Sequence, residues 1–369
     1  MVRFVSQLWL RSDILISVLV LLPNGLGNGA DASAGPPSDL RQGFSAARAA
    51  EEGNLLHART RQSLLDLIGR PPFEARPPLN PRVLSTTDEG EYIRSRVRYG
   101  NETDDVVWAW LLIPKEAARP APAIICLPGS FMTPNWGKDA PVGLAGPLVE
   151  GNPEAYGRDF AIAGYITLCP DYPCAGERTA PGRKPYDTTQ LDRRFPNWTR
   201  MGMSTWDVSR AVDFLLTIPE VDGRRIGCTG WSQGGLTTIL AAALDRRIAV
   251  AVSVCGWSPW RGRPATNVAA SYNFPGLAPY YREGQPLPVD VDEVAAMIAP
   301  RPFLNINAKE DHYFPNRTIL VTAEAEIAVY YESLDAGEKF QAVYVQGGHA
   351  YTEEVARTSR EWFGRWLRD

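Results

Sequence analysis

From about residue 123 onward, short apolar runs alternate with longer amphipathic stretches. In those stretches apolar residues recur three or four positions apart, which is typical of helices packed on a core. A strand buried on both faces needs a continuous apolar sequence, so this alternation predicts a mostly parallel sheet with helices on both faces. The expected strands cover residues 123–127, 165–169, 226–230, 249–255, 303–308 and 341–345, and the expected helices cover 156–163, 205–217, 234–244, 319–334 and 353–367.

The chain before this alternation has a different pattern. Helical spacing of apolar residues over 40–68 is followed by a proline-rich stretch, which predicts a helical lead-in and linker over residues 35–82. The main domain is then expected to cover residues 83–369. Its first part contains three extended runs that predict further strands, at residues 83–87, 92–99 and 106–113.

The first 34 residues have the pattern of an export signal. Arg3 and Arg11 precede an apolar run over residues 14–22, and either Ala30-Asp31-Ala32 or Ala32-Ser33-Ala34 provides small residues for cleavage. The run is shorter than the roughly 20 apolar residues that span a bilayer. We therefore expect a signal peptide over residues 1–34 and a periplasmic or secreted protein without a stable membrane span.

Charge and cysteine content narrow the possible partners. The 369 residues contain 38 Lys and Arg against 42 Asp and Glu, a net charge of −4, which lacks the basic footprint of a nucleic-acid-binding protein. A small molecule or a polysaccharide is the expected substrate. No cluster of Cys and His has metal-ligand spacing, so we expect no metal and no cofactor. Of the five cysteines, Cys126, Cys228 and Cys255 lie in apolar runs and are expected as buried thiols, and a disulfide between Cys169 and Cys174 is left open.

One motif carries the chemistry. Gly230-Trp231-Ser232-Gln233-Gly234 follows an expected strand and opens an expected helix, which is the setting of a nucleophile elbow. A serine on such a strained turn needs small flanking residues, because bulky ones would collide with the strand or the helix. Ser232 is therefore the predicted nucleophile. It needs a base to become reactive at neutral pH.

The chain has three histidines from which to choose that base. His57 lies in the lead-in, His312 lies beside a candidate acid, and His349 follows the last expected strand. Enzymes with such an elbow carry their triad in the order Ser, acid, His, which selects His349. The acid is expected after the strand at 303–308, and Asp311 is the prediction, with Glu310 as the neighbouring alternative.

Two further sets of residues are predicted with less direct signals. The backbone N–H of Gln233 and that of Ser130, in the loop after the strand at 123–127, are the expected oxyanion donors, with Gly129 or Phe131 as alternatives to Ser130. Aromatic side chains near the nucleophile and after Cys255 could contact a sugar or pack an irregular loop. The candidate substrate-binding residues among them are Trp231, Trp257 and Trp260.

With these residues identified, the chain from about residue 83 onward resembles the α/β-hydrolase superfamily. It is most similar to a dienelactone hydrolase-related branch with acetyl xylan esterase-like members. Besides the triad, the resemblance rests on four segments: residues 170–178 (PDYPCAGER), Trp206-Asp207 with residues 210–213 (RAVD), Val221-Asp222 with residues 225–227 (RIG), and residues 299–302 (APRP). The nucleophile here is Ser232, whereas true dienelactone hydrolases use Cys.

The resemblance implies an α/β-hydrolase catalytic domain over residues 83–369 that hydrolyses carboxylic esters without a cofactor. We expect short-chain acyl esters, acetyl above all, of carbohydrate-like alcohols, cleaved through an acyl-enzyme intermediate. Two alternatives stay open at this point. One is a prolyl oligopeptidase-like serine peptidase, and the other is a catalytically inactive binding protein on the same fold.

Overall fold

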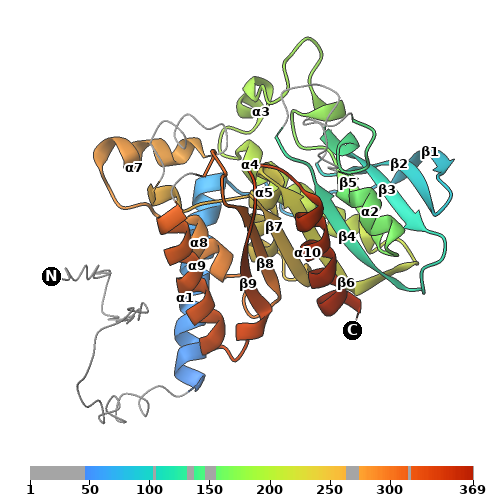
Figure 1. Ribbon diagram of the computed structural model, residues 1–369. Helices are drawn as coiled ribbons and strands as arrows, with labels where there is room; N and C mark the ends of the chain where they lie inside the picture. Colours follow the sequence, from blue (N-terminus) through green and yellow to red (C-terminus); the bar gives the residue numbers. More distant parts are fainter. Residues whose placement is uncertain are drawn as a thin grey trace, which may run out of the picture. The chain divides into compact units, whose positions relative to one another are not determined.

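A nine-stranded sheet lies at the centre of the computed structural model, which describes residues 46–102, 105–130, 137–145, 155–262, 274–314 and 317–368 (Figure 1). The strand order across the sheet is β1-β2-β3-β5-β4-β6-β7-β8-β9. The strands are β1 (Arg82–Asp88), β2 (Tyr92–Gly100), β3 (Val106–Pro114), β4 (Ala121–Leu127), β5 (Ile166–Pro170), β6 (Val221–Trp231), β7 (Val250–Val254), β8 (Phe303–Ala308) and β9 (Phe340–Val345).

The sheet has an antiparallel edge and a parallel body. Strands β1, β2 and β3 pair antiparallel, as do β3 and β5, whereas every pairing from β5 through β4 to β9 is parallel. The parallel strands therefore end at one edge, where the loops after them meet. This architecture confirms the predicted α/β-hydrolase fold with a mostly parallel sheet.

Each central strand places side chains in the hydrophobic cores on both faces of the sheet. In β4, for example, Ile125 and Leu127 enter one hydrophobic core, while Ile124 and Cys126 enter the other. All seven residues of β4 are buried. This two-sided burial is the physical reason why the strand reads as an uninterrupted apolar run.

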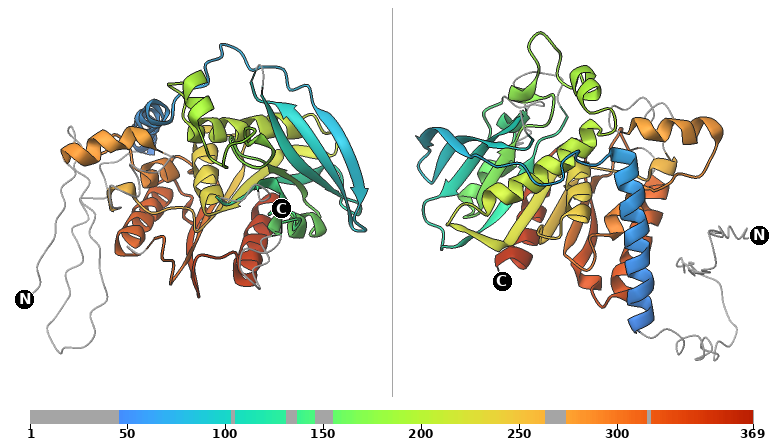
Figure 2. Two further views of the ribbon diagram at one scale, coloured as in Figure 1. Left: turned by 90° about the horizontal axis from the view of Figure 1, so that it is seen from above. Right: turned by 180° about the vertical axis from the view of Figure 1, so that it is seen from behind.

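Helices cover both faces of the sheet (Figure 2). One face carries α1, α4, α5, α8 and α9, and the other carries α2 and α10. Short helical turns lie in the loops around them. The helices are α1 (Ala46–Ile68), α2 (Tyr156–Ile162), α3 (Thr189–Arg194), α4 (Arg200–Leu215), α5 (Gln233–Leu244), α7 (Ala278–Glu283), α8 (Val291–Ala296), α9 (Arg317–Ser333) and α10 (Glu353–Phe363), with 3-10 turns at Gly137–Asp139, Gly176–Arg178 and Trp260–Gly262.

The lead-in helix α1 belongs to the same compact unit as the sheet, which extends from Ala46. It packs against α4 and α8, and Leu64 and Ile68 are buried in the core. The boundary predicted at residue 34 lies outside the described part of the chain, which begins at residue 46, and the boundary predicted at residue 82 stays a prediction.

Two differences from the expected helices have local causes. Helix α4 begins at Arg200, before the predicted start at 205, because the side chain of Thr199 caps it by accepting the Gly202 N–H at 3.1 Å. Helix α8 was not predicted, although its capping box of Asp290 and Glu293 is a sequence signal. The helix is short, so it shows almost no periodicity.

Two further findings bear on the expected location and thiols. Among the described residues, no helix combines the length and the apolar character needed to cross a membrane. All five cysteines are free, so Cys169 and Cys174 are not bonded to each other in this structure.

Candidate active site

The predicted nucleophile lies on a sharp turn between β6 and α5. Ser232 follows the last residue of β6 and precedes the first residue of α5, and its φ of 57° places it in the left-handed region. The turn is fastened to the neighbouring strand, because the Ser232 N–H donates to the Val254 carbonyl at 2.8 Å. A serine rarely adopts this backbone conformation, and such strain persists only where the surroundings hold it.

The two flanking glycines are required by close packing. A Cβ on Gly230 would lie 2.5 Å from the carbonyl carbon of Gly234, and one on Gly234 would lie 2.8 Å from the Pro128 carbonyl oxygen. Any side chain at these positions would therefore force β6, α5 and the loop after β4 apart. The glycines of the motif thus let the backbone fold tightly enough to present Ser232.

The structure brings the three predicted triad residues together. The Nε2 atom of His349 lies 2.9 Å from Ser232 Oγ, and its Nδ1 atom lies 2.7 Å from Asp311 Oδ2. The side chains of His349 and Asp311 are only 7% and 4% exposed. In this arrangement the imidazole can take the proton of the serine hydroxyl, while the carboxylate stabilises the imidazolium that forms.

The loops that carry the acid and the base are bonded to each other. The Lys309 N–H donates to the Val345 carbonyl at 3.0 Å, and the Glu310 N–H donates to the Gly347 carbonyl at the same distance. In addition, Asp311 Oδ1 accepts the Tyr313 N–H at 2.9 Å. The separation of Asp311 and His349 is therefore set by backbone pairing before any substrate binds.

The competing candidates lie elsewhere. His57, on α1, contacts the Tyr330 hydroxyl at 2.9 Å, and burial lowers the pKa of its imidazole. The ring of His312 lies 6.4 Å from that of His349. In the described part of the chain, His312 makes no hydrogen bond to Ser232 or Asp311. Glu310 contributes its backbone to the loop pairing, while Asp311 contributes the carboxylate that reaches His349.

The predicted oxyanion donors lie at the start of α5 and in the loop after β4. Gln233 is the first residue of α5, so its N–H is among those that have no partner within the helix. Gly234 packs directly against the Leu127 and Pro128 carbonyls, which brings the segment leading to Ser130 beside the elbow. Ser130 is exposed, and the alternative Phe131 lies outside the described residues. The two donor assignments stay proposals.

Aromatic rings surround the His349 imidazole. Between ring centroids, Tyr313 lies 4.7 Å, Trp231 5.1 Å and Phe314 6.0 Å from it. Trp231 is 6% exposed, whereas Tyr313 is 56% exposed. Tyr313 was not predicted from the sequence, because only the fold places the residue two positions after Asp311 beside the base.

Trp257 and Trp260 are packed inside the protein. They are 1% and 2% exposed, and the Trp260 ring lies against Phe274 with centroids 4.4 Å apart. This packing does not support the expectation that the two rings contact substrate, because neither has an open face among the described residues. Burial of their apolar surface instead stabilises the segment after β7.

A cavity of about 350 Å³ borders the acid loop. Its lining includes Asn307, Asp311, Arg317 and Tyr344, but neither Ser232 nor His349. Beside it, Glu324 of α9 accepts hydrogen bonds from Asn305, Asn307 and Tyr344 at 2.6, 2.7 and 2.5 Å. Burial raises the pKa of the Glu324 carboxyl to about 7. Glu324 thus holds the end of β8, which leads into the acid loop.

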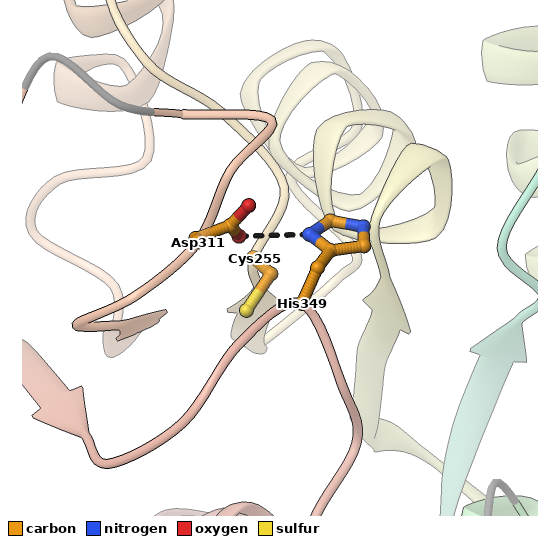
Figure 3. A group of neighbouring side chains, drawn as sticks. All are labelled: Cys255, Asp311 and His349. Atoms are coloured by element: carbon orange, nitrogen blue, oxygen red, sulfur yellow. Dashed lines mark hydrogen bonds and ion pairs between the residues drawn. The ribbon is translucent and has the colours of Figure 1, made fainter. Parts of the chain in front are cut away.

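One group of side chains has the composition of a metal site. Ligand atoms of Cys255, Asp311 and His349 all lie within 4.8 Å of one another (Figure 3). The 2.7 Å between Asp311 and His349 is the length of a hydrogen bond, however. Two ligands of one tetrahedral zinc, at about 2.0 Å from the ion, stand about 3.3 Å apart. The geometry therefore fits the acid–base pair of a triad with a thiol beside it.

The chain matches the models of two known protein families. The model of the Abhydrolase family matches residues 41–254, and a second model, described as glucuronyl esterase of fungi, matches residues 197–334. Among curated proteins, "Putative hydrolase YtaP" of Bacillus subtilis (strain 168) is 24% identical over 320 residues, covering 85% of this chain and 100% of that protein.

Solved structures share the fold. A CE15 glucuronoyl esterase from Teredinibacter turnerae T7901 superposes with a TM-score of 0.66 at 19% identity, covering 87% of this chain and 86% of that one. A "putative acetyl xylan esterase" from Bacteroides fragilis NCTC 9343 does so with a TM-score of 0.59 at 17% identity, covering 82% and 76%. At these identities the likeness establishes the fold.

Together these findings confirm the predicted ester hydrolase with a serine nucleophile. The narrower expectation of a dienelactone hydrolase-related branch stays a prediction. The Abhydrolase match spans more than half of the 369 residues and includes the nucleophile elbow. The chain belongs to the Abhydrolase family.

Proposed function

We propose that the protein is a serine esterase that cleaves carboxylic esters of carbohydrates through an acyl-enzyme intermediate. The observation that carries this proposal is the bonded series from Ser232 Oγ through His349 to Asp311, at 2.9 and 2.7 Å, on a nucleophile elbow. No other arrangement in the described residues joins a hydroxyl, an imidazole and a carboxylate in this way. Acyl transfer is the reaction that such a series performs.

The residues act in a defined order. The Ser232 hydroxyl donates to His349 Nε2, which takes the proton as Oγ attacks the ester carbonyl. Asp311 accepts from Nδ1–H, holds the ring in that tautomer and stabilises the imidazolium. The N–H groups of Gln233 and Ser130 donate to the oxyanion. His349 then protonates the leaving alcohol, and a water activated by the same ring releases the acid.

The rim of the site supports a carbohydrate substrate. Because His349 protonates the leaving oxygen, a side chain beside His349 borders the alcohol portion of the ester. That side chain is Tyr313, a large aromatic residue that is 56% exposed. An exposed aromatic face suits the apolar face of a sugar ring, with the phenol hydroxyl available to the sugar hydroxyls. The match of residues 197–334 to a glucuronyl esterase family supports the same substrate class.

The acyl group is the finer part of the proposal. We expect acetate to be preferred over long acyl chains, because the sequence contains no long apolar insertion that could form an acyl tunnel. A second candidate is an ester in which a uronic acid supplies the acyl group. It is favoured by the glucuronyl esterase match, whose span contains both Ser232 and Asp311.

A substrate panel tests the proposal. Acetylated xylo-oligosaccharides, a methyl glucuronate ester, p-nitrophenyl esters from acetate to decanoate and a prolyl peptide would be compared by kcat/KM on the mature protein. Acetylated sugars should be the best substrates, and rates should fall as the acyl chain lengthens. Exclusive activity on the glucuronate ester would select the second candidate. Activity on the peptide alone would overturn the proposal, whereas a maximum at octanoate or beyond would overturn only the preference for short acyl groups.

We also propose that the protein is exported and that its mature form begins near residues 31–35. The support is the charged start, short apolar run and small residues of the first 34 positions. N-terminal sequencing of the protein from its native host tests this. An intact Met1 on cytoplasmic protein would contradict it without affecting the proposed chemistry.

A further inference from the structure

The thiol of Cys255 lies beside the acid of the triad. Cys255 directly follows β7 and has no exposed surface. Figure 3 shows its side chain next to Asp311, reaching it from a different part of the chain than His349. The sulfur, the Asp311 carboxylate and the His349 ring nitrogen all lie within 4.8 Å of one another. The triad acid therefore has a third polar neighbour, which the mechanism above does not use.

The backbone at Cys255 adopts an unusual, bent conformation. Its φ of 45° lies in the left-handed region, which residues with a Cβ rarely adopt. Two contacts hold the bend. The Cys255 N–H donates to the Ile306 carbonyl at 2.7 Å, and Gly256 packs so closely that a Cβ there would lie 2.7 Å from the Gly235 Cα. Strain of this kind is found at functional sites.

The chemistry of the contact fits a donor and an acceptor. Asp311 Oδ2 accepts from His349 and Oδ1 accepts from the Tyr313 N–H, and a carboxylate has lone pairs for further donors. Burial raises the pKa of the Cys255 thiol to about 12, and the negative charge of Asp311 adds to the rise. The sulfur therefore keeps its proton at neutral pH, and it can donate that proton to the carboxylate.

We propose that Cys255 is a positioning residue of the triad, whose S–H donates to the Asp311 carboxylate and weakens the hold of that carboxylate on the His349 imidazolium. The proposal rests on the proposed function, because it assigns Asp311 and His349 their triad roles. A hydrogen bond to the ionised acid withdraws charge from it. Cys255 thereby tunes the pH at which His349 becomes a free base.

Other titratable side chains around this pair stay the same in every variant below. The rings of His312 and Tyr313, on the acid loop, lie 6.4 and 4.7 Å from the imidazole. Glu310, on the same loop, is joined by its backbone to Gly347 on the loop of the base. Their contributions to a pH profile are therefore common to the wild type and the variants, and they cancel in a comparison.

The test compares Cys255→Ala and Cys255→Ser in the full chain by the pH dependence of kcat/KM for p-nitrophenyl acetate. Alanine removes the donor, so the acidic limb should move up by about 0.5 pH unit. Serine offers a stronger donor, so the limb should move down by a similar amount. Shifts in opposite directions support the proposal. No shift, or shifts in the same direction, would overturn it, because a loss of packing would not move the acidic limb in opposite directions in the two variants.

A matched control is available in the same sheet. Cys228 is equally buried, but its sulfur lies 3.5 Å from the Thr238 hydroxyl of α5 and not beside a triad residue. Cys228→Ala and Cys228→Ser should lower the melting temperature by amounts comparable to the Cys255 variants and leave the acidic limb in place. A limb that moves equally in both sets of variants would show a general loss of packing and overturn the inference.

A second readout separates this inference from the proposed function. The rate at which a fluorophosphonate labels Ser232 also depends on His349 as base, but it does not depend on the ester substrate. If the wild type hydrolyses none of the esters, the proposed function fails, and the pH dependence of labelling still tests Cys255. If the esters are hydrolysed and the labelling profiles coincide, only the role of Cys255 fails.

Discussion

The ion-pair cluster around Arg178 and the triad around His349 are both buried and polar, but they differ in the group at the end of the bonded series. The ion-pair cluster joins Arg178 to Asp105 and to Asp207, which also accepts from Asn101 Nδ2 at 2.8 Å. The triad joins Asp311 to His349 and then to Ser232. The side chains of Arg178 and Asp207 are each 3% exposed, about as buried as Asp311 at 4%. Burial and pairing therefore do not distinguish a catalytic charge from a structural one.

The difference lies in the last member of each cluster. In the ion-pair cluster, the Arg178 guanidinium lies between two carboxylates that both pair with it, so the cluster joins charges that are already present in the protein. The triad ends at a hydroxyl that is itself uncharged, on a strained turn, with an exposed aromatic ring nearby. An incomplete series that a substrate atom can join is thus the better indication of chemistry.

The ion-pair cluster also explains two of the segments that carried the family resemblance. Arg178 ends the segment at residues 170–178, and Asp207 belongs to the Trp206-Asp207 pair. Their contact ties the loop after β5 to α4. Within the same loop, Asp171 accepts the N–H groups of Lys138 and Glu177 at 2.7 and 3.0 Å. These motifs hold loops at the active edge, so they specify the fold around the site.

The largest expected effect is on the triad. Ser232→Ala and His349→Ala should each lower kcat by about 10⁴-fold or more, because the triad residues act as a unit. Thermal unfolding should hardly change for Ser232→Ala, whereas His349→Ala should lower the melting temperature, because it leaves the buried Asp311 carboxylate without its imidazole donor. Ester hydrolysis and calorimetry on the same preparations check both statements. Near-normal turnover by Ser232→Ala would refute the assignment.

The acid is distinguished from its neighbour by a paired substitution. Asp311→Asn should cost about 10³- to 10⁴-fold in kcat, because the amide favours the wrong imidazole tautomer. Glu310→Gln is the control and should stay within a few-fold of wild type, because Glu310 contributes only its backbone to the site. A larger loss from Glu310→Gln than from Asp311→Asn would reverse the assignment.

Breaking the ion-pair cluster should lower the free energy of unfolding and leave kcat almost unchanged. Arg178→Met leaves Asp105 and Asp207 facing each other without their cation, which should lower the free energy of unfolding by about 3–5 kcal/mol. The kcat of the protein that remains folded should stay within a few-fold of wild type. Denaturant unfolding and active-site titration measure the two quantities separately.

A surface pair in the same loop provides the control for that experiment. Arg183 lies 3.2 Å from Asp187, and its side chain is 44% exposed. Arg183→Ala should change stability by less than about 1 kcal/mol, because water already screens this pair. If the two arginine variants lost equal stability, the distinction between buried and surface pairs would fail here.

Glu324 is a third kind of buried charge, held by neutral donors. Burial raises its pKa from 4.5 to about 7, so the folded protein binds the proton more tightly than the unfolded chain. Its contribution to stability is therefore fully present below pH 4.5 and is lost as the pH rises through about 7, by up to about 3 kcal/mol. Glu324→Gln should remove this slope, as judged from urea unfolding at pH 4.5, 6 and 8. An unchanged slope would assign the pH dependence to other groups.

The smallest expected effect is at the rim. Tyr313→Ala should raise KM for an acetylated sugar about 3- to 10-fold, which corresponds to about 1 kcal/mol of aromatic contact. Tyr313→Phe should retain most of the affinity. Ethyl acetate, which has no sugar to contact, is the matched control and should be hydrolysed at an unchanged rate. Equal losses on both substrates would mean that Tyr313 supports His349 and does not bind the alcohol.

Much of this fold could be predicted from the sequence because its signals are local. The apolar run at residues 123–127 became β4 with all its residues buried, and the expected strand at 303–308 became β8 with the same bounds. Ser232 was identified because its motif, its strand and its helix are adjacent in the chain. The separations of Asp311 and His349 from Ser232 were not predicted as distances, but the order of the expected strands placed both residues at the same edge.

The sequence by itself determined the main strands and helices, since periodicity and turn chemistry act between near neighbours, and it proposed the nucleophile from its motif and the acid and base from their order along the chain. Only the tertiary structure decided which side chains surround them. Cys255 and Asp311 are 56 positions apart, and no local pattern marks a thiol that lies against a carboxylate. In the same way, Trp257 and Trp260 have the composition of a sugar platform but pack in the core. Burial and long-range contact depend on how strands stack, which is a property of the whole sheet.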